Sequence, residues 1–344
     1  MPVQYRAGVL REHLHTRAAA SVFDVSHMGQ ILIRPRSGNL ADAALGLERL
    51  TPADFVSLQP GRQRYALFTV PGGGIFDDLM AANFGTHYFL VVNASRKRED
   101  AALLQTELQE TCEIELLTDH ALLAVQGPRA EAILSRIAPS VTGMRFMDAG
   151  LHSVMGIDCL VSRSGYTGED GFEISVPARR AVELWETLLR NPDLQPAGLG
   201  ARDSLRLEAG LCLYGNDIDL TTTPVEAALE WSIPKTRLQA GGFPGADVVL
   251  SQIESGVTRR RVGLRPESRP VRAGADLFAD ERTADTIGHV TSGGFGPTVN
   301  GPISMGYVST GYSQAGTKLF ADVRGERYPV SVHDLPFVAH RYKR

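Results

Sequence analysis

The pattern of hydrophobic and polar residues divides the chain into a longer first part and a shorter second part. In the first part, apolar residues recur at helical spacing, as at Leu10 and Leu14, or alternate with polar residues as in a half-buried strand. Helical spacing predicts helices over residues 5–20, 96–110, 129–137, 178–190 and 200–211. Runs bounded by turn residues predict strands over residues 21–34, 64–70, 88–92, 121–126, 157–163 and 173–176. Because strands and helices do not alternate regularly, an α+β fold is favoured over a doubly wound one.

The pattern changes near Thr258, after which little helical spacing remains. Short strands are predicted over residues 259–264, 276–278, 286–291, 305–308 and 318–323. Glycine and proline separate them, and we interpret Ser292–Pro297 as such a turn. This texture predicts a small all-β barrel or sandwich. We place the boundary within residues 247–257 and expect two parts, residues 1–250 and 258–344.

Composition narrows the class of protein. The 344 residues are 43% hydrophobic and 22% charged, which excludes wholesale disorder. The net charge of −4 argues against a general nucleic-acid binder, and no apolar run is long enough to cross a membrane. The three cysteines are widely spaced, which favours a reducing compartment over a disulfide framework or a zinc site. The first residues lack the layout of a signal peptide.

Two acidic, glycine-rich segments could carry chemistry. In Gly72–Leu79, the adjacent Asp77 and Asp78 follow a glycine run. If they lie on a strand, only one can face a shared pocket, and a solvated hairpin turn is the alternative. The segment Ser162–Glu173 fits a hairpin, except that Glu173 begins a predicted strand. The carboxylate of Glu173 lies either at a solvated strand end or in a polar cavity, and the sequence pattern does not distinguish these two positions.

Three further features have simpler explanations. Arg202, Arg206 and Glu208 fit ion pairs on the solvated face of a helix. The segment Tyr214–Asp219 lacks the central glycine and closing glutamate of a calcium loop, so no metal is predicted. A lone histidine such as His27 is more often structural than catalytic. No glycine motif opens a helix after a strand, so no nucleotide cofactor is expected either.

Longer matches point to one family. The segments that carry them are Met1–Tyr5, Phe23–Gly29, Gly73–Leu79, Gly165–Glu173, Ala201–Gly210, Tyr214–Asp217, Thr223–Glu226 and Gly288–Gly293. In this order they resemble the aminomethyltransferase (T-protein) family of the glycine cleavage system, over essentially the whole chain. The resemblance implies a three-domain, cloverleaf-like fold around a folate channel, with two α+β domains before a C-terminal β-barrel.

The resemblance also implies a reaction and its partners. Tetrahydrofolate is the co-substrate, and the aminomethyl group arrives on the lipoyl arm of H-protein. The products are 5,10-methylene-tetrahydrofolate, ammonia and reduced lipoyl H-protein, and the P- and L-proteins belong to the same system. Because this family's H-protein is acidic, we expect docking through an arginine patch near the channel mouth. The location implied is cytoplasmic in a bacterium, which is preferred, or the mitochondrial matrix in a eukaryote.

Matched positions imply the roles of individual residues. Asp78 corresponds to the acid near the transfer centre, and Asp77 is expected to face the other side of the strand. Glu173 would accept hydrogen bonds from the pterin, and Arg202 would bind the glutamate carboxylates of folate. Two tyrosines complete the expected folate site, Tyr166 and the C-terminal Tyr342.

The chain departs from the family pattern at two places. Members normally have a further segment before Met1–Tyr5, and its absence here indicates truncation or a misplaced start. Some members have tyrosine where this chain has Ala82, so one folate contact is expected to differ.

Related folate domains leave other functions open. Sarcosine and dimethylglycine oxidases need a flavin module that this chain has no room for. A folate-dependent sulfoniopropionate demethylase remains an alternative. So does a non-enzymatic iron–sulfur assembly factor, although its hallmark cysteine is absent from Gly165–Asp170.

Overall fold

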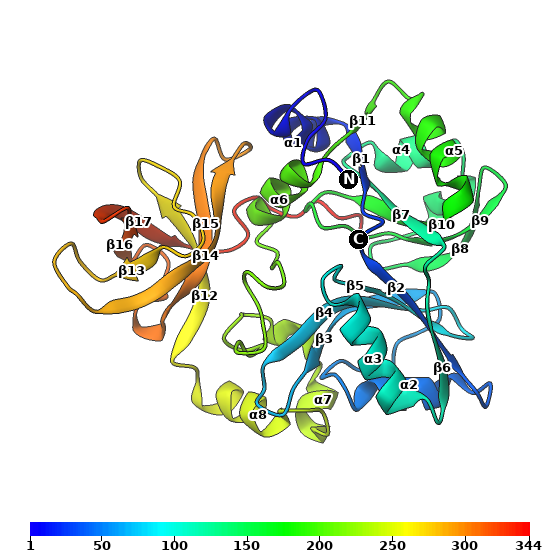
Figure 1. Ribbon diagram of the computed structural model, residues 1–344, viewed down its shortest axis with the longest axis horizontal. Coiled ribbons are helices and arrows are strands. Elements are labelled where there is room, and N and C mark those ends of the chain that lie inside the picture. The colour runs from blue at the N-terminus through cyan, green and yellow to red at the C-terminus, as the bar shows by residue number, and fades with distance from the viewer.

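A computed structural model describes residues 1–344 as three lobes. One lobe is built on a five-stranded sheet, a second on a six-stranded sheet and the third on a closed barrel. Figure 1 shows the barrel to one side of the two sheet lobes, with the C-terminal tail running back between them. The predicted α+β, three-domain arrangement with a C-terminal barrel is therefore confirmed.

The five-stranded lobe is antiparallel, in the order β3-β4-β5-β2-β6. Its strands are β2 (Gly29–Pro35), β3 (Arg62–Thr69), β4 (Ile75–Asn83), β5 (Tyr88–Val92) and β6 (Cys112–Leu116). The helices α2 (Leu40–Glu48) and α3 (Lys97–Leu108) pack on it. Apolar side chains of both helices and of the sheet form one buried cluster, which leaves the opposite face free to border the second lobe.

The six-stranded lobe has the order β11-β1-β7-β10-β9-β8. Its strands are β1 (Ala20–Asp24), β7 (His120–Gln126), β8 (Ala149–Val154), β9 (Ile157–Ser162), β10 (Gly171–Pro177) and β11 (Leu194–Pro196). Its helices are α1 (Val9–Ala18), α4 (Ala130–Leu134), α5 (Ala178–Leu189) and α6 (Leu199–Glu208), with the short 3-10 helix η1 at Pro139–Gly143. Only β1 and β11 run parallel, so the sheet is mixed.

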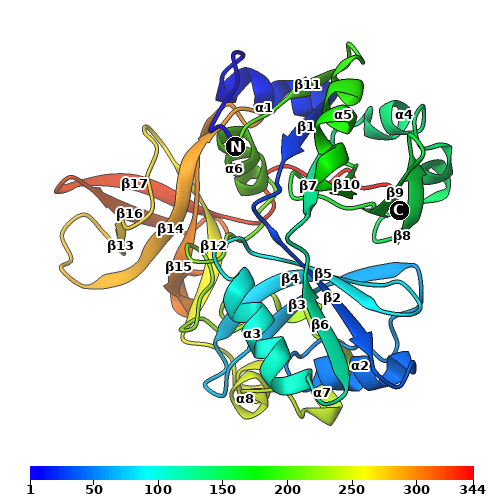
Figure 2. The same ribbon diagram turned by 45° about the vertical axis from the view of Figure 1, so that its right-hand side comes forward.

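The single strand predicted over residues 21–34 is wrong, because the chain breaks there into β1 and β2. These two strands belong to different sheets. The Oδ1 atom of Asp24 accepts a hydrogen bond from the backbone N–H of Ser26 at 3.0 Å, which is the geometry of an Asx turn. The turn moves the chain from the second lobe to the first, so the two sheets are joined through this segment (Figure 2).

A helical linker precedes the barrel. It contains η2 (Glu230–Ser232), α7 (Lys235–Ala240) and α8 (Ala246–Ser255), so a helix occupies the segment where the sequence placed the boundary. The barrel order is β12-β15-β14-β13-β16-β17. Its strands are β12 (Arg259–Pro266), β13 (Asp276–Phe278), β14 (Thr286–Gly296), β15 (Gly301–Ser309), β16 (Lys318–Val323) and β17 (Glu326–His333), with η3 at Thr310–Tyr312.

The turn predicted at Ser292–Pro297 is wrong, because β14 continues to Gly296. A Cβ atom at Gly293 would lie 1.9 Å from the carbonyl oxygen of Val271. The glycine therefore permits close packing of backbone in the barrel instead of a turn. None of the helices in the molecule is long and apolar enough to span a membrane.

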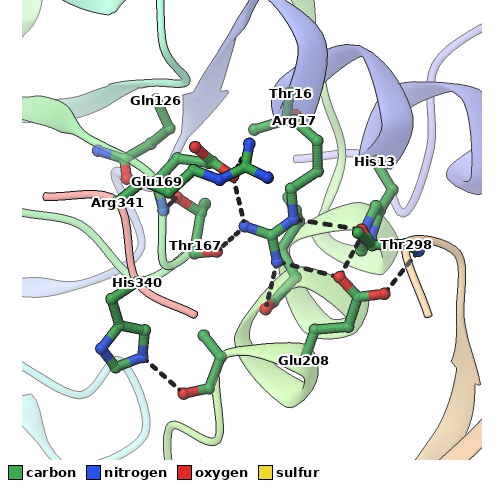
Figure 3. A network of polar contacts seen from close by, with 12 residues as sticks. His13, Thr16, Arg17, Gln126, Thr167, Glu169, Glu208, Thr298, His340 and Arg341 are labelled. Atoms are coloured by element: carbon green, nitrogen blue, oxygen red, sulfur yellow. Dashed lines mark hydrogen bonds and ion pairs between the residues drawn. The ribbon is translucent and has the colours of Figure 1, made fainter. Parts of the chain in front are cut away.

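A buried polar network joins the lobes (Figure 3). From α1, Arg17 donates hydrogen bonds to the carboxylates of Glu169, at 3.0 Å, and Glu208, at 3.1 Å. Glu208 also contacts His13 at 3.0 Å and accepts from the backbone N–H of Thr298, in the barrel, at 2.7 Å. Both glutamates are fully buried. The network thus ties α1, α6 and the barrel together at the centre of the molecule.

The interpretation of Arg202, Arg206 and Glu208 of α6 as solvated ion pairs is therefore wrong, and Arg202 forms no ion pair at all. Glu208 lies in the network, and Arg206 is buried with its Nη1 atom 2.7 Å from Asp217. Asp217 comes from the segment compared above with a calcium loop, and it also accepts hydrogen bonds from Thr291 and Ser292 of the barrel. Its carboxylate is thus occupied in joining the linker to the barrel.

Candidate active site

The adjacent acids lie on β4, at the face of the first lobe that turns toward the centre. Asp78 accepts hydrogen bonds from the hydroxyl of Tyr65 at 3.0 Å and from the Nδ2 atom of Asn93 at 2.6 Å. Tyr65 lies on the neighbouring β3, and Asn93 follows the end of β5. Burial and the nearby charge of Asp77 raise the pKa of Asp78 to about 7. A carboxyl group with that pKa can release or accept a proton at neutral pH.

Asp77 is fully buried and its side chain lies against that of Asp100 of α3. Asp78 is only half-buried. The two carboxyl groups therefore differ in access, as the alternation of a strand requires. Asn93 lies beside both, because its Nδ2 atom also donates to Oδ1 of Asp77 at 2.9 Å.

Glu173 lies inside β10, between β7 and β9, and not at a strand end. It lines a mainly apolar pocket formed by side chains of both sheets, among them Ala82, Phe89 and Leu122. Burial raises the pKa of Glu173, and the charge of Arg202 partly opposes this rise. Its side chain receives no hydrogen bond from the rest of the chain, and burial and the charge of Arg202 are the influences on its pKa. The carboxylate is thus free to accept hydrogen bonds from a ligand.

Arg202 and Tyr166 form a second pair at the centre. The guanidinium of Arg202 lies 4.8 Å from the ring centroid of Tyr166, which is a cation–π contact. The Nη1 atom of Arg202 is buried without a hydrogen-bond partner. The hydroxyl of Tyr166 donates to the carbonyl oxygen of Cys212. Arg202 therefore keeps donor groups available for an anionic ligand.

Tyr342 belongs to the C-terminal tail, which returns from the barrel to the second lobe (Figure 1). Its ring stacks on Phe146 with centroids 4.1 Å apart. Its hydroxyl lies 3.5 Å from the carbonyl oxygen of Gly165, the residue before Tyr166. The tail is held by Arg341, which pairs with Glu169 at 3.5 Å. Tyr342 thus lies at the edge of the site and not beside Asp78.

The structure brings four of the predicted residues, Asp78, Tyr166, Glu173 and Arg202, near enough for their charges to influence one another. The charges of Asp78 and Arg202 both influence the pKa of Tyr166, and the charges of Glu173 and Arg202 influence each other. Sequence reasoning missed Tyr65 and Asn93, which bind Asp78 directly. Asn93 could have been predicted from the sequence, because it is a polar residue at the end of a strand that follows the two acids. No group of three His, Cys, Asp or Glu side chains is arranged to hold a metal ion.

Known proteins match this chain along nearly its whole length. Residues 1–237 match the GCVT N-terminal domain model, and residues 259–339 match the glycine cleavage T-protein C-terminal barrel domain model. The mitochondrial aminomethyltransferase of Dictyostelium discoideum is 42% identical, over 100% of this chain and 88% of that protein. That of Homo sapiens is 44% identical, over 99% of this chain and 85% of that protein.

A solved structure agrees with the fold. The glycine cleavage system aminomethyltransferase T from Bartonella henselae is 43% identical and matches with a TM-score of 0.93, covering 100% of this chain and 93% of that one. The family models, the curated relatives and the solved structure thus all name one enzyme class. The chain belongs to the aminomethyltransferase (T-protein) family of the glycine cleavage system.

Proposed function

We propose that this aminomethyltransferase passes the methylene of an aminomethyl group, carried on lipoylated H-protein, to tetrahydrofolate. The observation that carries the proposal is the unpartnered carboxylate of Glu173 in the apolar pocket between the two sheets. A pterin presents a ring N–H beside an exocyclic amine, and one carboxylate can accept both hydrogen bonds. The free donors of Arg202 suit the glutamate carboxylates of the folate tail.

The transfer balances without a redox cofactor. N5 and N10 of the folate each form a bond to the methylene carbon, while the bonds from that carbon to the lipoyl sulfur and to nitrogen break. The two protons lost from the folate nitrogens end on the sulfur and on the ammonia. The protein's work is to align the two substrates, to exclude water and to move protons. We assign the proton movement at the folate to Asp78, which Tyr65 and Asn93 hold in place.

The remaining assignments follow from position. Tyr166 lies against Arg202 and supplies an aromatic wall, while Tyr342 closes the edge of the site from the tail. Ala82 lines the same pocket as Glu173, so the contact that a tyrosine would make there is absent. We also propose that the second domain unit begins after α8, which ends at Ser255, and before β12, which begins at Arg259.

The proposed location depends on the source. The relatives from Dictyostelium and Homo sapiens are named mitochondrial, which fits the matrix for a eukaryotic chain. For a bacterial chain we propose the cytoplasm. In either case the P- and L-proteins are the proposed other members of the system.

The Glu173→Gln variant tests the folate site. It removes a charge-assisted acceptor worth about 1.5–3 kcal/mol, so folate binding should weaken by about ten- to a hundredfold. Tetrahydrofolate should raise the unfolding temperature of the parent, whereas NAD, FAD and zinc should not. Isothermal titration of both proteins with tetrahydrofolate measures the difference.

A matched control for that variant is Glu183→Gln, an exposed glutamate on α5 paired only with Arg180. Its folate affinity should equal that of the parent. Equal affinities of the parent and Glu173→Gln would remove Glu173 from the site.

Docking of H-protein is expected to depend on basic residues beside the site. Arg96, Lys97 and Arg98 follow Asn93 after two small residues, and Arg98 is exposed at the start of α3. We propose that this segment receives an acidic surface of H-protein. Reversing the charge with Arg98→Glu should raise the KM for H-protein about five- to tenfold at low salt, with kcat little changed. The effect should shrink as salt is added.

Steady-state kinetics at two ionic strengths checks this expectation. The control is Arg179→Glu, an exposed arginine on α5 of the second lobe. A KM that stays constant from low to high salt, or an equal response in the two variants, would contradict docking through this segment.

A further inference from the structure

Behind the site lies a pair of acids that the transfer reaction does not use directly. Asp77 of β4 and Asp100 of α3 are both fully buried, and their carboxyl groups lie against each other. No N–H or O–H group elsewhere in the chain donates to either oxygen of Asp100. Two ionised carboxylates in this position would repel each other in a medium that solvates charge poorly. One of the two must therefore carry a proton.

The hydrogen bonds decide which of them is protonated. Asp77 accepts a hydrogen bond from the backbone N–H of Asn93 at 3.1 Å and another from its Nδ2 atom at 2.9 Å. Donors of this kind stabilise the ionised form of a carboxyl group. Asp100 has none of them, so it is the neutral acid that donates to Asp77. In agreement, burial and then the charge of Asp77 raise the pKa of Asp100 well above its ordinary range.

Asn93 connects this pair to the site. Its Nδ2 atom reaches Oδ1 of Asp77 at 2.9 Å and Oδ1 of Asp78 at 2.6 Å, and also the carbonyl oxygen of Asp78 at 3.0 Å. Its backbone N–H is fixed by Asp77 as well. The amide that orients Asp78 is thus itself oriented by Asp77.

We propose that Asp100 and Asp77 are positioning residues for the transfer step, with a protonated Asp100 holding Asp77 so that Asn93 keeps Asp78 in its reactive orientation. The proposal rests on the proposed role of Asp78. It adds two residues that do not touch either substrate and gives a reason for the buried acid at the start of α3.

Other charged or titratable groups face the pair. Arg96 and Glu99 act on Asp100 from its own helix, and Asp78 lies next to Asp77 on β4. Tyr214 of the linker is close enough for both acids to influence its pKa. Arg96 lowers the pKa of Asp100, whereas Glu99 raises it, and burial together with Asp77 outweighs both. Below that raised pKa the pair shares one proton, and above it both carboxyl groups become ionised.

The test compares Asp100→Leu, which fills the space but cannot donate, with Asp100→Asn, which keeps a neutral donor. Single-turnover methylene transfer should fall about tenfold in Asp100→Leu, the loss expected for one charge-assisted hydrogen bond. Asp100→Asn should recover most of the rate. Thermal unfolding should show no matching loss of stability in the leucine variant, because an apolar residue replaces a buried carboxyl. Glu99→Gln, an exposed change in the same helical turn, is the control and should match the parent.

The pH profile supplies a second readout. In the parent the rate should decline at alkaline pH as Asp100 loses its proton, and this decline should be absent from Asp100→Asn. If Asp100→Leu does not fold, the difference in pH profile between the parent and Asp100→Asn is enough to test the proposal. A leucine variant as fast as the parent, or an asparagine variant as slow as the leucine variant, would overturn the proposal. A fully active Asp78→Asn would instead contradict the proposed role of Asp78. The activity of that variant therefore distinguishes a failure of the proposed function from a failure of the positioning role of Asp100.

Discussion

Replacing Asp78 by asparagine should lower the rate of methylene transfer by about 10²–10⁴, the usual range for loss of a positioned proton-transfer group. The variant should fold normally and bind tetrahydrofolate nearly as well as the parent, because Tyr65 and Asn93 can still contact the new side chain. The measurement is single-turnover transfer from aminomethyl-H-protein. Asp77→Asn is the matched variant, and it should cost much less, since Asp77 acts on the reaction only indirectly, through Asn93 and through its charge.

The same pair of variants gives a pH test. Burial and the charge of Asp77 raise the pKa of Asp78 to about 7, so its ionised form appears as pH rises through neutrality. The parent rate should rise over that range if the carboxylate accepts the folate proton, and Asp78→Asn should lose this dependence. A small, pH-independent loss would mean that Asp78 only orients folate electrostatically. A fully active Asp78→Asn, or a larger defect in Asp77→Asn, would show that the acid is wrongly assigned.

Replacing Arg17 by methionine should lower the free energy of unfolding by about 3–5 kcal/mol, the usual loss when one partner of a buried ion pair is removed. The guanidinium lies between two fully buried carboxylates, those of Glu169 and Glu208, and methionine leaves both without their central counter-charge. Urea unfolding measures the loss. Arg129→Met removes an exposed arginine that pairs with Asp193, and it should cost less than about 1 kcal/mol.

The network also predicts the direction of the response to acid. Burial alone would raise the pKa of Glu208, but hydrogen bonds from His13 and Thr298 and the charges of His13 and Arg17 lower it to about 2. An unfolded glutamate has a pKa of about 4.3. The stabilisation is therefore present above that value and is lost as pH falls toward about 2. A difference between parent and Arg17→Met that stayed constant between pH 5 and 2 would contradict this origin.

The sequence predicted those elements whose local pattern agrees with their surroundings. The strands β5, β13 and β16 begin and end where the apolar runs predict. No strand was predicted over β17, which contains Pro329, a residue that is unfavourable within a strand. In the barrel, the carbonyl oxygen of Pro329 accepts from Glu267, and neighbouring Val330 and Val332 are buried. The strand pairing and burial of β17 thus stabilise it despite the proline.

In the candidate site, too, the contacts that depend on tertiary packing could not be predicted from the sequence. Family motifs identify Asp78, Glu173 and Arg202, and their roles stay predictions. The contacts that hold Asp78 come from β3 and from the end of β5, and strand pairing alone brings these together. In the sequence, Asp100 looks like an ordinary acidic residue in the first turn of a helix. Its burial against Asp77 becomes visible only once α3 is packed on the sheet.

The transfer itself can be measured in one assay. The purified chain is mixed with aminomethylated H-protein and tetrahydrofolate, and methylene-tetrahydrofolate, ammonia and reduced lipoyl groups are measured together. All three should appear in equal amounts, and dimethylsulfoniopropionate should not replace the H-protein substrate. Transfer no faster than the uncatalysed reaction, in a protein that binds tetrahydrofolate, would contradict the proposed function.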